Sequence, residues 1–278
     1  MEKLVAFSRL YGSDPELTVA GGGNTSMKEN GILYVKGSGA ALADICAENF
    51  VAMDMEKLMA MTKKAYPQED DAREAAFLKD MLDARMPGEE EKRPSVETLL
   101  HAFFPQRYVL HLHPNLVNGL TCAVNGEKEA KILFPNAAWV GESRPGYILA
   151  MKLKDEIESG ADTVLMQNHG VFYAADTPEE LDSMLKGMLE KLETAVQEGY
   201  DPVLDVPPMP EKPFTPDQIV YCGLGPDLPD TETAAQIWDG AKKVAHYAAS
   251  FGGQRPMSEE LTDFIANWEA EKYRRKNA

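Results

Sequence analysis

The chain has 278 residues, and its 44% hydrophobic and 26% charged content is typical of a soluble globular protein with one large or two small domains. The net charge of −17 argues against nucleic acid or anionic membranes as partners, and it is explained most simply by solubility. Cys46, Cys122 and Cys222 have no paired spacing, which argues against a disulfide framework and against a cysteine-type zinc site. Without a signal-peptide pattern or a long apolar run, we expect a cytoplasmic protein.

The first hundred residues are expected to form helices around a short hairpin. A helix and turn at 1–18 precede two strands that meet at Asn30-Gly31, a dipeptide typical of tight hairpin turns. Glycine-rich loops, 20–27 and 37–39, flank this hairpin. The next expected elements are a short strand (50–54), an amphipathic helix (71–85) and a helix (96–104) that follows the N-cap Ser95.

The remaining pattern alternates short strands with helices, which favours a mixed or largely antiparallel sheet covered by helices. The expected elements are strands at 108–114, 163–168 and 171–174 and helices at 115–123, 147–159 and 177–197. The proline-rich segment 205–213 indicates a stiff connector. Beyond it we expect a strand (218–222) and two helices (231–250 and 257–274), so the chain divides into a catalytic domain (1–204) and a C-terminal extension (205–278).

Three histidines form the clearest candidate site. His111 and His113 lie two residues apart in an apolar run, so on a strand both side chains point to one face. His169 ends another strand-like run and is a candidate third ligand. Three neutral imidazoles with open positions suit a catalytic zinc ion. The pair alone is equally consistent with two core histidines bonded to backbone groups.

Two further features have both a functional and a structural interpretation. Glu97 and His101 are four residues apart and share a helix face, so Glu97 is a candidate general acid/base beside a metal, or the two form a solvated or capping pair. The loops at 21–26 and 36–39 suit close approach of backbone N–H groups to an anion, or they are simple tight turns.

Five motifs occur in order along the chain: Gly-Gly-Gly-Asn-Thr-Ser (21–26), Lys-Gly-Ser-Gly (36–39), Pro-Ser-Val-Glu (94–97), His-Leu-His-Pro (111–114) and Gln-Asn-His-Gly (167–170). This combination resembles the class II aldolase/adducin family, and within it sugar-phosphate aldolases such as the fuculose- and rhamnulose-1-phosphate aldolases. The first two motifs are most similar to the aldolase half of bifunctional rhamnulose-phosphate aldolase/dehydrogenase proteins, and residues 267–274 are similar to the segment that follows that half. We expect no dehydrogenase module in a chain of this length.

The resemblance implies a three-layer α/β/α sandwich around a mainly antiparallel sheet, assembled as a homotetramer with sites at subunit interfaces. It implies a zinc ion (Zn²⁺) or another divalent transition metal, bound by His111, His113 and His169. It also implies that Glu97 is the catalytic acid/base. The residues that it assigns to phosphate binding are Gly23, Asn24, Ser38, Gly39 and Ser95. Val96 stands where family aldolases often carry a second small hydroxyl residue, which removes one phosphate hydrogen bond. Lys36 is either a compensating charge or a solvent-facing side chain.

The implied reaction is reversible cleavage of a ketose 1-phosphate, a small sugar phosphate, to dihydroxyacetone phosphate and an aldehyde. Zinc would stabilise the enediolate, and Glu97 would protonate its carbon. The sequence does not identify the residue that protonates the aldehyde oxygen: a tyrosine, aspartate or histidine would serve, including His101 or a tyrosine of a neighbouring subunit. Alternatives are a sugar-phosphate epimerase, a decarboxylase, or an adducin-like interaction module, for which Trp268 and Tyr273 would form a partner face unless they pack on the body.

Overall fold

The computed structural model describes all residues except 197–199, 202–210, 225–228 and 278. Within this described part, a seven-stranded sheet has the order β3-β2-β1-β4-β7-β6-β5, and all neighbours are antiparallel except the parallel pair β5–β6. The mainly antiparallel sheet that the sequence predicts is therefore confirmed. The strands are β1 (Asn24–Glu29), β2 (Ile32–Lys36), β3 (Phe50–Asp54), β4 (Tyr108–Leu112), β5 (Ala138–Val140), β6 (Thr163–Met166) and β7 (Gly170–Ala175).

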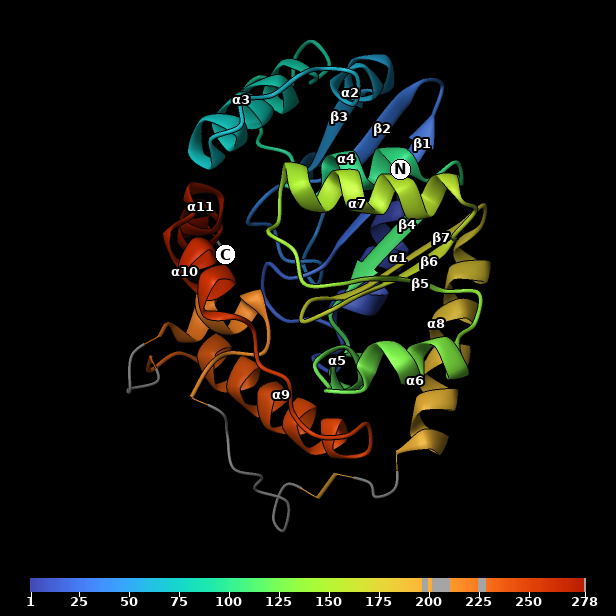
Figure 1. The fold of residues 1–278 in the computed structure, drawn as a ribbon. Coiled ribbons are helices and arrows are strands. Elements are labelled where there is room, and N and C mark those ends of the chain that lie inside the picture. The colour runs from blue at the N-terminus through green and yellow to red at the C-terminus, as the bar shows by residue number, and fades with distance from the viewer. Residues whose placement is uncertain (197–199, 202–210, 225–228, 278) are drawn as a thin grey trace.

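Helices cover both faces of the sheet (Figure 1). One face packs against α1 (Glu2–Gly12), α5 (Asn115–Thr121), α6 (Gly126–Leu133) and α8 (Pro178–Ala195). The other face packs against α2 (Met55–Met61), α3 (Asp70–Asp83), α4 (Thr98–Phe103) and α7 (Tyr147–Glu158). On β4, Leu110 joins the first core and Val109 the second, as the two-residue period of a strand requires. The three-layer sandwich is thus confirmed.

The predicted hairpin joins β1 to β2 through Asn30 and Gly31. Their φ angles are 52° and 76°, the left-handed conformation that a two-residue hairpin turn requires at both central positions. β1 then pairs with β4, with Asn24 opposite His111. The hairpin therefore places the first glycine-rich loop at the end of β4 where the histidines lie.

Three expected elements differ from the structure. The helix α4 begins at Thr98 because the Ser95 hydroxyl accepts the Glu97 N–H and the Ser95 carbonyl accepts the Thr98 N–H, so a turn precedes the helix. The segment Gln218–Cys222 is a π-helical turn rather than a strand, fixed at its start by a bond from the Phe214 N–H to the Gln218 side chain. The helix expected at 257–274 is two helices, α10 (Glu259–Asn267) and α11 (Glu269–Asn277), because the backbone is extended at Trp268.

The C-terminal extension packs beside the sheet rather than over either face (Figure 1). Its helix α9 (Glu232–Ala249) contacts α5, where a Cβ on Gly119 would meet the Tyr247 side chain at 2.3 Å. Most of the predicted connector at 205–213 lies outside the described residues. Among the helices that the structure describes, none has both the length and the apolar character needed to cross a membrane.

Candidate active site

The three predicted histidines converge at one end of the central strands. His111 belongs to β4, His113 follows its last residue, and His169 lies in the turn between β6 and β7. One ring nitrogen from each lies within 4.8 Å of the others, and the Nε2 atoms of His111 and His113 are 3.0 Å apart. Asn168 supports the turn with a φ of 58° and donates its side-chain amide to two backbone carbonyls. The cluster therefore has the spacing of a shared metal site.

Hydrogen bonds fix which ring nitrogen of two histidines carries the proton. The Nδ1 of His111 lies 3.0 Å from the Val171 carbonyl oxygen, and the Nδ1 of His113 lies 2.5 Å from Asp217 Oδ2. Both partners accept, so each Nδ1 is protonated and each Nε2 presents its lone pair to the cluster. Burial lowers the pKa of His111 well below its usual value and that of His169 to about 4, so both are neutral at neutral pH, as metal ligands must be.

Glu97 lies directly beside the histidines. Its Oε1 is 3.4 Å from His111 Nε2 and 3.3 Å from His169 Nε2, while Asn24 Nδ2 donates to Oε2 at 2.5 Å. Burial alone would raise the Glu97 pKa, but the neighbouring imidazoles and the Asn24 bond outweigh it and lower the pKa to about 2. Oε1 is buried and has no hydrogen-bond partner among the described residues, an arrangement that is costly unless a cation or a substrate proton occupies the space. The residues present therefore fit a divalent metal ion.

His101 supports Glu97 from behind. Its Nε2 donates to Asn24 Oδ1, and its Nδ1 lies 2.7 Å from the Ser26 hydroxyl. The ring is fully buried, and burial lowers its pKa to about 3. Because His101 does not line the pocket beside Glu97, we assign it to the positioning of Asn24 rather than to proton transfer on a substrate.

A small polar pocket opens beside Glu97 and His169. It contains all the residues that the resemblance assigns to phosphate: Gly23, Asn24, Ser38, Gly39 and Ser95. Gly23 and Gly39 have φ angles of 61° and 87°, which favour glycine, and a Cβ on Gly23 would also lie 2.8 Å from the His111 carbonyl oxygen. The Ser38 N–H is bonded to the backbone, which leaves its hydroxyl as the donor for a ligand.

Lys36 belongs to this pocket and does not face solvent. It is 2% exposed, and its Nζ donates to the carbonyls of Gly21 and Ala40, at 2.9 and 2.7 Å. The lysine thus joins the two glycine-rich loops and leaves one N–H for the pocket. Burial lowers its pKa to about 7.

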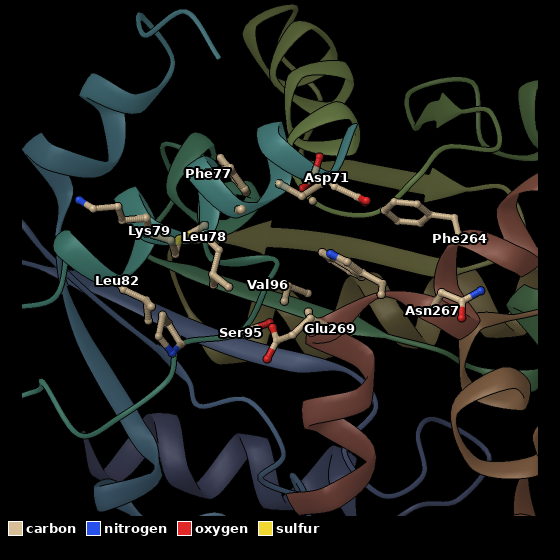
Figure 2. A pocket seen from close by; sticks show the side chains of 17 residues that line it. Asp71, Phe77, Leu78, Lys79, Leu82, Ser95, Val96, Phe264, Asn267 and Glu269 are labelled. Atoms are coloured by element: carbon tan, nitrogen blue, oxygen red, sulfur yellow. The ribbon is translucent and has the colours of Figure 1, made fainter. Parts of the chain in front are cut away.

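A larger and mainly apolar cavity of about 790 Å³ adjoins the polar pocket (Figure 2). Side chains of α3, including Phe77 and Leu82, and of the last two helices, including Phe264, form its walls. Trp268 also lines it, and Tyr273 stacks on the Arg93 guanidinium at 4.2 Å, so both aromatic residues pack on the body of this chain. Ser95, Val96 and Ala270 line both pockets and form the partition between them.

Three charged residues of the site were not predicted from the sequence. Asp217 contacts His113, while Glu271 and Arg274 line the polar pocket. Glu271 and Arg274 lie within residues 267–274, where the resemblance to bifunctional proteins was the available signal, although it assigned them no role. Asp217 has no local signal, and it lies 104 residues along the chain from His113.

The fold and this cluster define a known class of protein. The model of the class II aldolase and adducin N-terminal domain matches residues 2–196, so the chain belongs to this family. It is 36% identical over 192 residues to a protein named uncharacterized oxidoreductase YuxG of Bacillus subtilis (strain 168), which covers 64% of this chain and 27% of that protein. The chain thus spans about a quarter of that relative.

The similar solved structures include the following two. The N-terminal class II aldolase domain of a conserved protein from Thermoplasma acidophilum is 29% identical with a TM-score of 0.61, covering 70% of this chain and 92% of that chain. YgbL from Klebsiella pneumoniae, titled a putative aldolase/epimerase/decarboxylase, is 17% identical with a TM-score of 0.51, covering 69% and 86%; this likeness shows the fold alone. The family match ends at residue 196, so Asp217, Glu271 and Arg274 lie beyond it.

Proposed function

We propose that this protein is a zinc-dependent aldolase that reversibly cleaves a ketose 1-phosphate to dihydroxyacetone phosphate and an aldehyde. The observation that carries the proposal is the buried, unpartnered Oε1 of Glu97 beside His111 and His169, in a pocket lined by candidate anion donors. A module that only binds other proteins has no need for this arrangement. When bound, zinc supplies Lewis-acid stabilisation of the negative charge that develops during carbon–carbon cleavage.

The polar pocket would hold the substrate phosphate. The Ser38 and Ser95 hydroxyls and the remaining N–H of Lys36 are its candidate donors. Binding the phosphate there would hold the adjacent carbons next to Glu97, which lines the same pocket.

Glu97 would transfer the proton at the substrate carbon. Asn24 anchors its Oε2, so Oε1 is the free oxygen. In synthesis the ionised carboxylate would take a proton from C3 of dihydroxyacetone phosphate; cleavage is the reverse, in which the protonated form of Glu97 gives a proton to that carbon. The lowered pKa keeps the carboxylate ionised and ready to accept the proton at neutral pH.

We also propose a cytoplasmic homotetramer in which a neighbouring subunit supplies the acid for the aldehyde oxygen, since His101 is enclosed behind Asn24. Val96 lines both the polar pocket and the apolar cavity, so the two are neighbours. The apolar cavity therefore offers space for the aldehyde chain of a substrate whose phosphate lies in the polar pocket. The net charge of −17 argues against nucleic acid or an anionic membrane as a partner.

Hydrogen exchange tests the proposal without knowledge of the aldehyde. Zinc-loaded protein is incubated with dihydroxyacetone phosphate in heavy water, and NMR follows loss of one C3 hydrogen. We expect stereospecific exchange that requires zinc and that stops in Glu97→Gln, which retains the amide contact to Asn24. Absence of exchange in a protein that binds zinc firmly would contradict the aldolase and favour an epimerase or decarboxylase. Absence of both exchange and zinc binding would favour an interaction module.

A further inference from the structure

The C-terminal extension contacts the candidate metal centre through Asp217. Its Oδ2 lies 2.5 Å from His113 Nδ1, and both side chains are 6% exposed. Asp217 precedes the π-helical turn at 218–222, beyond the residues that match the family. His113 therefore faces the carboxyl group of Asp217, which also accepts a hydrogen bond from Arg274, whereas His111 faces a backbone carbonyl.

Arg274 of α11 holds the other oxygen of Asp217. Its Nη2 donates to Asp217 Oδ1 at 3.0 Å, and its Nε lies 2.7 Å from Glu271 Oε2. The guanidinium also lies over the Tyr221 ring, 5.6 Å from its centre. With the carboxyl groups of Asp217 and Glu271 and an aromatic face around it, Arg274 holds the Asp217 side chain in one orientation. A continuous chain of charged contacts thus runs from α11 to a candidate metal ligand.

We propose that Asp217 is a positioning residue of the metal centre and that Arg274 keeps it in place. A carboxylate that accepts the Nδ1–H of a ligating histidine fixes the ring's tautomer and orientation and makes its other nitrogen a stronger ligand. The C-terminal extension therefore completes a site whose three histidines come from the family domain. This inference rests on the proposed function only in requiring that the histidines bind a metal ion.

Zinc affinity provides the test, because it is read without any enzymatic activity. Asp217→Asn keeps the shape of the side chain but loses the charge, and we expect its zinc dissociation constant to rise about 10- to 100-fold in competition with a chromophoric chelator. Arg274→Gln keeps Asp217 but removes the guanidinium that bonds to its carboxylate. We expect its zinc dissociation constant to rise less, by about threefold or more. Asp263→Asn is the matched control: it removes an exposed carboxylate of α10 and should leave zinc affinity unchanged.

The visible spectrum of bound cobalt gives a second readout of the same geometry. Asp217→Asn should shift the cobalt absorption bands, since His113 would be held differently, while Asp263→Asn should not. Circular dichroism is used to check that each variant is folded. If Asp217→Asn does not fold, the zinc affinity of Arg274→Gln alone tests the proposal. Zinc affinities of the folded Asp217→Asn and Arg274→Gln variants within twofold of wild type would overturn the positioning role alone. A wild-type protein that binds no zinc would overturn both this role and the proposed aldolase.

Discussion

The most informative substitution is Asn24→Ala, because Asn24 joins Glu97 to His101. Its Nδ2 donates to Glu97 Oε2, and its Oδ1 accepts from His101 Nε2. Asn24, Glu97 and His101 are 3%, 7% and 0% exposed, so the groups left behind would not reach bulk water. The substitution should therefore strand a carboxylate oxygen and an imidazole N–H at once.

The magnitude follows from these two losses. A hydrogen bond to a charged group contributes about 1.5–3 kcal/mol, and a stranded buried neutral donor costs about 1–3 kcal/mol. The sum is about 2.5–6 kcal/mol, and a water molecule in the vacated space would offset part of it, so we expect Asn24→Ala to lower the free energy of unfolding by about 3 kcal/mol. Catalysis should fall as well, because misplacing the Glu97 carboxylate by about 1 Å costs on the order of 100-fold in rate.

Urea unfolding in the presence of a chelator measures the stability change, and deuterium exchange of dihydroxyacetone phosphate measures the rate. Asn267→Ala is the control, since that exposed side chain makes one bond at the end of α10, and we expect less than about 0.5 kcal/mol. In the double variant Asn24→Ala/His101→Phe, the stranded imidazole is gone, so the combined loss should be smaller than the sum by about 1 kcal/mol or more. Strict additivity, or an Asn24→Ala protein as stable as wild type, would refute the reasoning.

Three further substitutions probe the metal ligands, the anion loop and the strand packing. His169→Ala should remove one of three imidazoles, so zinc should be lost on gel filtration; a stoichiometric zinc content would contradict its role as a ligand. Ser38→Ala should raise KM about tenfold for phosphorylated substrates and little for unphosphorylated ones, and an equal effect on both would remove the hydroxyl from the phosphate site. Gly170→Ala would place a Cβ 2.3 Å from the Leu112 carbonyl oxygen, so β4 and β7 must separate and the melting temperature should fall; Gly187→Ala in α8, where a Cβ meets nothing within 4 Å, should instead leave stability unchanged or higher by up to about 1 kcal/mol. A Gly170→Ala protein with the same melting temperature as wild type would show that β4 and β7 accommodate the added methyl group without loss of stability.

The features predicted correctly from the sequence are those set by neighbouring residues. The two-residue period of a strand is enough to place His111 and His113 together, although His113 lies just past the end of β4. Asn30-Gly31 specifies its turn through the conformations that these residues tolerate. In each case the determining interactions lie within a few residues along the chain.

The features that the sequence did not predict depend on contacts between distant segments. Gln218–Cys222 has the apolar content of a strand, yet it forms a helical turn whose start is held by the bond from the Phe214 N–H to the Gln218 side chain. Lys36 resembles a solvent-facing residue, yet two carbonyls from the glycine-rich loops enclose it. The roles of Asp217 and Arg274 were not predicted, because their partners lie 104 and 57 residues away. Such residues become visible only once the chain is folded.

The charges of the site bear on the order in which it would be filled. Glu97 and Asp217 are ionised at neutral pH because their pKa values are lowered, and Arg274 is opposed by Asp217 and Glu271. Lys36, with a pKa of about 7, is charged in only part of the molecules near neutral pH. The pocket therefore has no excess of positive charge to offer a phosphate, despite its buried guanidinium. A divalent cation at the three histidines would reverse that balance, so an anionic substrate gains electrostatic attraction only after the metal has bound. On this reasoning a metal ion would act in substrate binding as well as in the proposed cleavage, and Asp217, which adds a negative charge behind His113, would favour binding of the cation before the substrate.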